Sequence, residues 1–352
     1  MKQLLKLIIF LLSWPYAMQS QAQPVGWAST DSIADGGRGE NPVVVSNQEE
    51  LLKAFGKKDS THRTIYLQGR IDVSTMLRIK DTRNKTLIGL PGSALANDRY
   101  TLNNDSTGIL LFQNCRNIVV RNVTFIGPGA FDRDGNDCLC ITRSQYVWID
   151  HCDFQDGMDA NLDCNRGSDN ITVSWCRFRY LRQPWPKLPD DTNEDHNSDH
   201  RFSNLWGSSD REGPASAGKL RTTFDHCWWD EGCRMRMPFV RFAKIHLLNC
   251  LYSSSVAGNY IHARYQSNIL VEGCVFVNKP KNTKFFQTPG TSKPEYADYN
   301  IRFRQCLGAP DVEQRHGDAP YFTPPYPYTL QPAAEVEQAV RNAAGATLET
   351  KL

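Results

Sequence analysis

Long hydrophobic runs are lacking in all but the first residues of this 352-residue chain. No segment after residue 22 approaches the roughly 18 consecutive apolar residues of a membrane-spanning helix, so we expect no membrane span in the mature protein. The first residues, MKQLLKLIIFLLSWPYAMQSQA, contain two lysines, a short apolar run from Leu7 to Trp14 and a small-x-small pattern ending at Ala22. They predict a signal peptide over residues 1–22 and a secreted or periplasmic protein with a single domain over residues 23–352.

An excess of charge of one sign is lacking too. The chain has 40 Lys and Arg against 38 Asp and Glu, and loss of Lys2 and Lys6 with the signal peptide leaves 38 of each. Proteins that bind nucleic acid generally carry a basic field, so this balance predicts no nucleic-acid partner. Cysteine is absent before Cys115, which argues against a lipid-anchored amino terminus.

The cysteines that do occur are regularly spaced. Cys152, Cys176, Cys227, Cys250 and Cys274 are separated by 24, 51, 23 and 24 residues. Disulfide frameworks belong mainly to domains too small to build a core, and a repeat near 24 residues explains this spacing better. We expect small buried side chains with free thiols, with disulfides as the alternative.

The residues around these cysteines repeat as well, and each repeat alternates apolar and polar residues with the period of a strand. The segments are NIVVRNVTF (Asn117–Phe125), YVWIDHCDF (Tyr146–Phe154), NITVSWCRF (Asn170–Phe178), KIHLLNCLY (Lys244–Tyr252), NILVEGCVF (Asn268–Phe276) and a looser NIRFRQCLG (Asn300–Gly308). Short strands at this spacing predict an all-β, single-domain, right-handed parallel β-helix with long loops. A globular α/β fold is the weaker alternative, because helical periods occur only near the ends, at residues 48–55 and 333–343, where we expect caps over the open ends of the solenoid.

Residues at similar offsets from the cysteines should meet at one edge of such a solenoid. Asp159 and Asp163 follow Cys152 by 7 and 11 residues, Arg236 follows Cys227 by 9, and Asp137 lies about one coil before Asp159. Three converging carboxylates repel one another unless a cation neutralises them, and an all-oxygen site suits Ca²⁺. The alternative for each of these residues, and for Arg241, is an ordinary solvated surface position.

Five segments resemble polysaccharide lyase family 1, the pectate lyases, and they occur in the family's order over residues 34–276. They are ADGGRG (Ala34–Gly39), NKTLIGLPG (Asn84–Gly92), VWIDHCDF (Val147–Phe154), LWGSSD (Leu205–Asp210) and RMPFVRF (Arg236–Phe242).

The resemblance implies a pectin lyase-like solenoid that cleaves polygalacturonate by β-elimination and leaves 4,5-unsaturated ends. It implies that Asp137, Asp159 and Asp163 bind Ca²⁺, that Arg236 is the base and that Arg241 contacts a substrate carboxylate. Asp150 and His151 belong to the third segment, and we expect neighbours on a strand to point to opposite faces.

The sequence departs from the family at Phe202, which stands where the family has a substrate-contacting lysine. Arg201 beside it is the candidate replacement, although a neighbour on a strand faces the other way. The stretch at residues 183–200 is longer than the family's and is either a solvated loop or an additional metal site.

Three other functions stay as alternatives: a pectin lyase acting on methylated chains, a hydrolase with paired carboxylates, and a polygalacturonate-binding β-helix without catalysis. In the absence of an association signal we expect a monomer.

Overall fold

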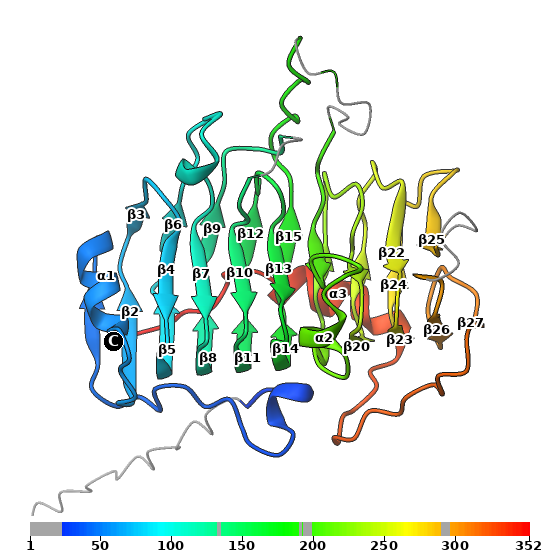
Figure 1. The fold of residues 1–352 in the computed structure, drawn as a ribbon, viewed down its shortest axis with the longest axis horizontal. Coiled ribbons are helices and arrows are strands. Elements are labelled where there is room, and N and C mark those ends of the chain that lie inside the picture. Colours follow the sequence, from blue (N-terminus) through cyan, green and yellow to red (C-terminus); the bar gives the residue numbers. More distant parts are fainter. Residues whose placement is uncertain (1–22, 132–134, 190–191, 193–198, 290–295) are drawn as a thin grey trace, which may run out of the picture.

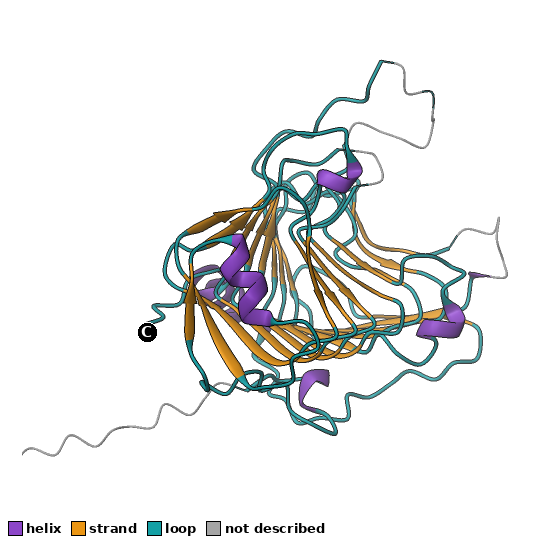
Figure 2. Cartoon of the chain, turned by 60° about the vertical axis from the view of Figure 1, so that its left-hand side comes forward, coloured by secondary structure: helices purple, strands orange, loops and turns teal. Residues whose placement is uncertain are grey.

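The strands of the chain wind into a solenoid with three walls. The structure is a computed structural model that describes residues 23–131, 135–189, 192, 199–289 and 296–352, and the predicted signal peptide, residues 1–22, lies outside these. Figure 1 shows the strands of successive coils side by side along the long axis, and Figure 2 shows the three walls around one interior. No helix within the described residues is long and apolar enough to cross a membrane.

Each wall is one sheet. Sheet A contains β1 (Val43–Val45), β2 (Arg63–Leu67), β5 (Arg83–Gly89), β8 (Arg116–Arg121), β11 (Gln145–Asp150), β14 (Asp169–Ser174), β17 (Thr222–Asp225), β20 (Lys244–Leu248), β23 (Ser267–Glu272), β26 (Tyr299–Arg304) and β27 (Val312–His316). Sheet B contains β3 (Arg70–Asp72), β6 (Ala94–Ala96), β9 (Thr124–Ile126), β12 (Asp153–Gln155), β15 (Arg177–Arg179), β18 (Trp228–Trp229), β21 (Leu251–Tyr252) and β24 (Val275–Phe276). Sheet C contains β4 (Leu77–Lys80), β7 (Leu110–Gln113), β10 (Leu139–Thr142), β13 (Leu162–Asn165), β16 (Asn204–Trp206), β19 (Phe239–Val240), β22 (Asn259–Ala263) and β25 (Lys284–Gln287).

Strand pairing confirms the predicted parallel β-helix. Neighbouring strands in each sheet are parallel, and the pair β26 and β27 is antiparallel. Five of the predicted repeats coincide with successive strands of sheets A and B, while the coil formed by β17 and β18 was not among them. Its sequence TTFDHCWW follows the long insert between Cys176 and Cys227, which obscures the repeat.

The cysteine ladder is confirmed as a row of buried free thiols. All eleven cysteines are free, and the five predicted ladder cysteines are buried. Each of these five directly follows a residue in the left-handed region, such as His151 with φ 48° or Asn249 with φ 50°, so the chain turns sharply from sheet A into sheet B. The amide of Cys152 donates to Sγ of Cys176 at 3.4 Å, which links adjacent coils.

An aromatic stack runs beside the cysteines through the core. Its rings come from the last position of successive repeats, with centroids 4.4–5.6 Å apart along the sequence Phe125, Phe154, Phe178, Trp229, Tyr252 and Phe276. The stack and the aliphatic side chains around it form one continuous core along the solenoid. Each coil packs mainly against its two neighbours, and the core consists of side chains from equivalent positions of successive coils.

Helices cover the solenoid at two different places. The helix α1 (Gln48–Phe55) buries Leu51 and Phe55 at the amino-terminal end, as predicted. The helix α3 (Ala333–Ala343) does not cap the other end as expected, because it packs Val336 and Val340 on an outward row of sheet B formed by Trp228, Leu251 and Val275. That row is apolar, so the helix buries its own apolar stripe against it.

The remaining short elements are α2 (Gly213–Ser216) and the 3₁₀ helices η1 (Trp27–Ser29) and η2 (Asn104–Ser106). The proline-rich segment at residues 320–332 has no helix or strand and crosses the outside of sheet A, where Phe322 and Tyr326 pack against Trp27 and Leu270. The chain after α3 then runs back toward the amino-terminal end, where the amide of Leu348 donates to Asn122.

The aromatic stack predicts a large stability effect at a single position. Phe154 is fully buried between Phe125 and Phe178, so Phe154→Ala removes a ring from both contacts and leaves a cavity. We expect a loss of about 3–5 kcal/mol in the free energy of unfolding, measured by denaturant titration. Leu181→Ala, at a side chain that is 58% exposed, is the control and should change it by less than about 0.5 kcal/mol. Equal effects of the two variants would contradict this account of the core.

Candidate active site

Strand register aligns a row of side chains on the outside of sheet C. Asp163 on β13 pairs with Leu205 on β16, Leu205 with Phe239 on β19, and Phe239 with His262 on β22. The residues that flank Asp163 on its strand belong to the core, so Asp163 itself points outward. The row therefore passes from a carboxylate to two apolar side chains and then to an imidazole.

The other two predicted carboxylates come from the turns that lead into sheet C. Asp137 lies two residues before β10, and Asp159 lies three residues before β13 on the next coil. The coils are joined here by a hydrogen bond of 3.1 Å from the amide of Cys138 to the carbonyl of Ala160. The structure thus brings Asp137, Asp159 and Asp163 to one edge of two adjacent coils.

The environment of these carboxylates opposes their ionisation. Burial, followed by the charges of Asp163 and Asp159, raises the pKa of Asp137 well above its ordinary value. Burial and the charge of Asp159 raise the pKa of Asp163 to about 8, although Arg236 and a 2.9 Å hydrogen bond from the amide of Leu205 act in the opposite direction. The two carboxyl groups hold protons in a range where exposed aspartates are ionised.

The three carboxylates differ in their hydrogen-bond partners and do not surround a common point. Among the described residues Oδ1 of Asp137 is buried and has no hydrogen-bond partner, whereas Oδ1 of Asp159 lies 2.9 Å from Nε2 of His200. In the part of the chain that the structure describes, no three acidic, histidine or cysteine side chains are gathered closely enough to hold a metal ion. The carboxylates are therefore electrostatically coupled but are not arranged around one point.

The two predicted arginines, which lie next to β19, are each placed over an aromatic ring. Cζ of Arg236 is 4.3 Å from the ring centroid of Phe202 and 5.8 Å from that of Phe239. Cζ of Arg241 is 4.3 Å from the Phe239 centroid, and its guanidinium donates to Asp210 at 2.6 Å and to the carbonyl of Gly207 at 2.9 Å. Arg236 has φ 60° in the left-handed region, so the backbone turns at this residue.

Two residues of this site were not identified from the sequence. Arg264 donates three hydrogen bonds to Asp210, and Arg241 donates to the same carboxylate. Burial and then the charges of Arg264, Arg241 and Arg236 lower the pKa of His262 to about 3, so this imidazole is neutral. The repeat was the available signal, because Arg264 and His262 each follow a residue of RMPFVRF by 23 residues, which is one coil.

Burial is also the first cause that lowers the pKa of Arg241, and the nearby charges of Arg264 and Arg236 act in the same direction. Asp210 opposes this shift through its hydrogen bond and its charge. The arginines of this site therefore lie near enough to repel one another, and Asp210 is the carboxylate that offsets the repulsion between Arg241 and Arg264.

Phe202 and Arg201, the two residues considered for the position of the family's lysine, have different surroundings. Phe202 is 6% exposed and lies beneath Arg236, so it presents a ring where a cation was expected. Arg201 forms a two-bond ion pair with Asp199, at 2.7 and 2.8 Å, which raises the pKa of Arg201. Most acidic residues of the 183–200 stretch lie at 190–191 and 193–198, outside the described residues. Its two interpretations, a solvated loop and an additional metal site, therefore stay predictions.

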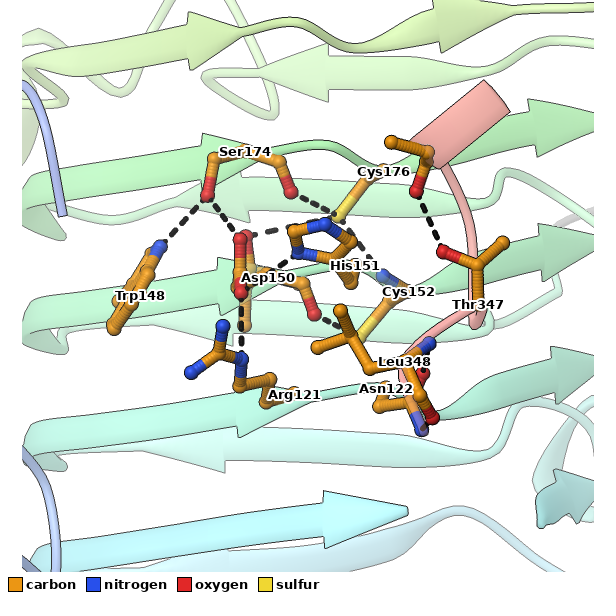
Figure 3. Close-up of polar contacts among 12 residues, drawn as sticks. Arg121, Asn122, Trp148, Asp150, His151, Cys152, Ser174, Cys176, Thr347 and Leu348 are labelled. Atoms are coloured by element: carbon orange, nitrogen blue, oxygen red, sulfur yellow. Dashed lines mark hydrogen bonds and ion pairs between the residues drawn. The ribbon is translucent and has the colours of Figure 1, made fainter. Parts of the chain in front are cut away.

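The expectation for Asp150 and His151 was wrong. β11 ends at Asp150 and His151 is left-handed, so the imidazole folds back and its Nδ1 lies 2.9 Å from Oδ2 of Asp150. Figure 3 shows Arg121, His151 and Ser174 around this carboxylate, with Ser174 donating to it at 2.6 Å. This network belongs to sheet A, whereas Asp163 belongs to sheet C.

The fold and the site together define a class, the right-handed parallel β-helix proteins with acidic and arginine side chains on the outside of one sheet. A family model described as pectate lyase matches residues 1–347. A pectate trisaccharide-lyase of Thermotoga maritima is 31% identical over 256 residues, which is 67% of this chain and 60% of that protein, and a pectate lyase of Emericella nidulans is 26% identical over 275 residues, 76% and 72% of the two chains. The chain belongs to the pectate lyase family.

Solved structures show the same fold. A Bacillus pectate lyase crystallised with trigalacturonate has a TM-score of 0.68 at 20% identity, over 92% of this chain and 98% of that one. A pectate lyase of Paenibacillus sp. 0602 has a TM-score of 0.68 at 16% identity, over 94% and 97%. The chain spans about 60% of the length of the Thermotoga relative.

The raised pKa of Asp163 predicts a pH-dependent stability. Asp163 holds its proton up to about pH 8 in the folded protein but has an ordinary value of 3.8, so between these values the folded state binds more protons than the unfolded state. The free energy of unfolding contributed by this group is therefore present at low pH and is lost as the pH rises toward 8. In a chelator, Asp163→Asn should gain stability over the wild type progressively from about pH 4 to 8.

The measurement is thermal or denaturant unfolding across this pH range, with Asp318→Asn, at an exposed residue, as the control. A difference between Asp163→Asn and the wild type that stays constant with pH would contradict the prediction.

Proposed function

We propose that this protein is a calcium-dependent pectate lyase that cleaves α-1,4-linked polygalacturonate by β-elimination, with Arg236 as the base. The observation that carries the proposal is the pair of buried carboxyl groups, Asp137 and Asp163, whose pKa values are raised beside an arginine on the outside of one sheet. Family membership supports the reaction type, and related structures are described with trigalacturonate and with a hexasaccharide bound.

The donor set fits Ca²⁺. Asp137, Asp159 and Asp163 provide only oxygen, which hard cations prefer, and Oδ1 of Asp137 is buried without a partner in the part of the chain that the structure describes. A cation would remove the mutual repulsion that raises the pKa values of Asp137 and Asp163. Because the carboxylates are not gathered around one point, binding requires a side-chain rotation, and Asp159 would exchange His200 for the ion. Bound Ca²⁺ would supply charge neutralisation for a substrate carboxylate.

The arginines supply the other half of the chemistry. Arg236 acts in its neutral form, after losing a proton to solvent, and takes the proton from C5 of a galacturonate residue, so the C5–H bond breaks and an N–H bond forms. The electron pair of the C5–H bond forms the C4–C5 double bond, the C4–O bond breaks, and the glycosidic oxygen leaves with its chain and takes a proton from water. Arg241 is held by Asp210 and Gly207 and binds a substrate carboxylate through its remaining donors. Arg201 is the second carboxylate contact, where the substrate competes with Asp199.

Absorbance in the ultraviolet tests elimination directly, because the 4,5-unsaturated product absorbs and a hydrolysis product does not. With polygalacturonate at mildly alkaline pH we expect absorbance to rise with added Ca²⁺ and to stay flat with a chelator. New reducing ends without absorbance would mean a hydrolase instead. No product from polygalacturonate in either condition would favour methylated pectin as the substrate or a binding role.

Substitution of the base separates chemistry from binding. Arg236→Ala should lower kcat by about 10²–10⁴-fold, the usual contribution of a general base, while the protein stays folded. The matched control is Arg315→Ala on β27, an exposed arginine on sheet A, which should keep full activity. Asp163→Asn should instead lose activity together with the stabilisation by Ca²⁺ that we expect for the wild type in thermal unfolding. Full activity of Arg236→Ala would exclude this residue as the base.

A further inference from the structure

We propose that Phe202 and Phe239 form an aromatic floor beneath Arg236 and Arg241, and that Phe202 is a positioning residue that holds the Arg236 guanidinium for proton transfer. The inference rests on the proposed function and deepens it. Phe202 stands where the family has a substrate-contacting lysine, and in this chain its ring face supports an arginine instead of supplying a charge of its own.

Distances place both guanidinium groups over ring faces. Arg236 lies over Phe202 at 4.3 Å and is also 5.8 Å from Phe239, while Arg241 lies over Phe239 at 4.3 Å. All three separations are within about 6 Å, the range in which the negative face of a ring attracts a cation. Phe239 is shared, so the floor fixes the two guanidinium groups relative to each other.

The side chain of Arg236 depends on these rings more than that of Arg241 does. Arg241 is also held by Asp210 and by the carbonyl of Gly207. For Arg236, the described part of the chain contains neither a hydrogen bond to its side chain nor an ion pair with it. Ring faces attract the guanidinium without occupying its N–H groups in hydrogen bonds, so one N–H group can lose its proton and leave a neutral nitrogen that accepts the C5 proton.

Phe202 is itself held in place through its backbone and through one ring contact. The hydroxyl of Tyr180 donates to the carbonyl of Phe202 at 2.5 Å, and Phe202 forms a parallel bridge with Met235, the residue before Arg236. The His200 ring lies 4.0 Å from the Phe202 ring on another side. Phe202 is 6% exposed, so its ring has little freedom to move and the position of Arg236 follows from it.

The floor acts on the reaction through position. A ring face attracts the guanidinium cation both before it loses a proton to solvent and after it gains one from C5, so its charge effect does not by itself speed the transfer. What the ring adds to the chemical step is a fixed place for the nitrogen that accepts the proton. Loss of the ring should therefore affect the chemical step more than it affects substrate binding.

The test compares Phe202→Leu, which keeps an apolar side chain without a ring, with Phe202→Tyr, which keeps the ring. For Phe202→Leu we expect kcat on polygalacturonate to fall about tenfold or more, with KM within about threefold of the wild type. Phe202→Tyr should restore most of kcat. The matched control is Tyr146→Leu on sheet A, where Cζ of Arg116 lies 4.2 Å from the Tyr146 ring, and it should leave kcat unchanged.

A second measurement does not depend on activity. In the NMR spectrum, the Nε–H proton of Arg236 should be shifted upfield by the ring current of Phe202, and the shift should be lost in Phe202→Leu. An unshifted proton in the wild type would overturn the floor even if the protein is an active lyase. Unchanged kcat in Phe202→Leu, or an equal fall in Tyr146→Leu, would overturn the positioning role. If the wild type produces no unsaturated ends, the proposed function fails, and the NMR result alone decides the floor.

Discussion

Parallel hydrogen bonding between successive coils is the constraint on which the rest of this structure depends. It places every coil one strand spacing, about 4.8 Å, from the next and keeps equivalent residues in register. In the interior this register stacks cysteine on cysteine and ring on ring. On the outside of sheet C it aligns Asp163, Leu205, Phe239 and His262, so the site is a row of side chains that is extended along the solenoid.

The same regularity produces an electrostatic tension. Carboxylates at equivalent edges of adjacent coils are brought together whether or not they attract, and Asp137 and Asp163 accordingly have raised pKa values. Arginines two coils further on face the same problem, and Asp210 offsets the repulsion between Arg241 and Arg264. In the acidic cluster Arg236 and His200 act against the raised pKa of Asp163 but do not overcome it, and this difference is the physical reason to expect a cation at the acidic end and a substrate anion near the arginines.

Sequence periodicity predicted the parts of the fold that repeat. The cysteine spacing predicted the solenoid and the buried ladder, because each coil needs a small side chain at the same turn. The periodicity gave no guide to residues whose conformation or packing does not follow the repeat. His151 contacts Asp150 because a left-handed residue ends the strand, and α3 lies on sheet B because Trp228, Leu251 and Val275 form an apolar row that no local pattern around α3 reveals. The separation of 51 residues between Cys176 and Cys227 also hid the phase of Phe202.

The site could be predicted as a set of residue types but not as a set of contacts. Counting from the repeat brought Asp137, Asp159, Asp163 and Arg236 to one edge, and the structure places them there. Their partners depend on side-chain directions that the period does not contain, such as His200 beside Asp159 and Asp199 beside Arg201. Phe202 shows why this matters. Read from the sequence it is a missing cation, but in the structure its ring supports a cation from the next coil, so a substitution that removes one charge also creates a new way to hold another.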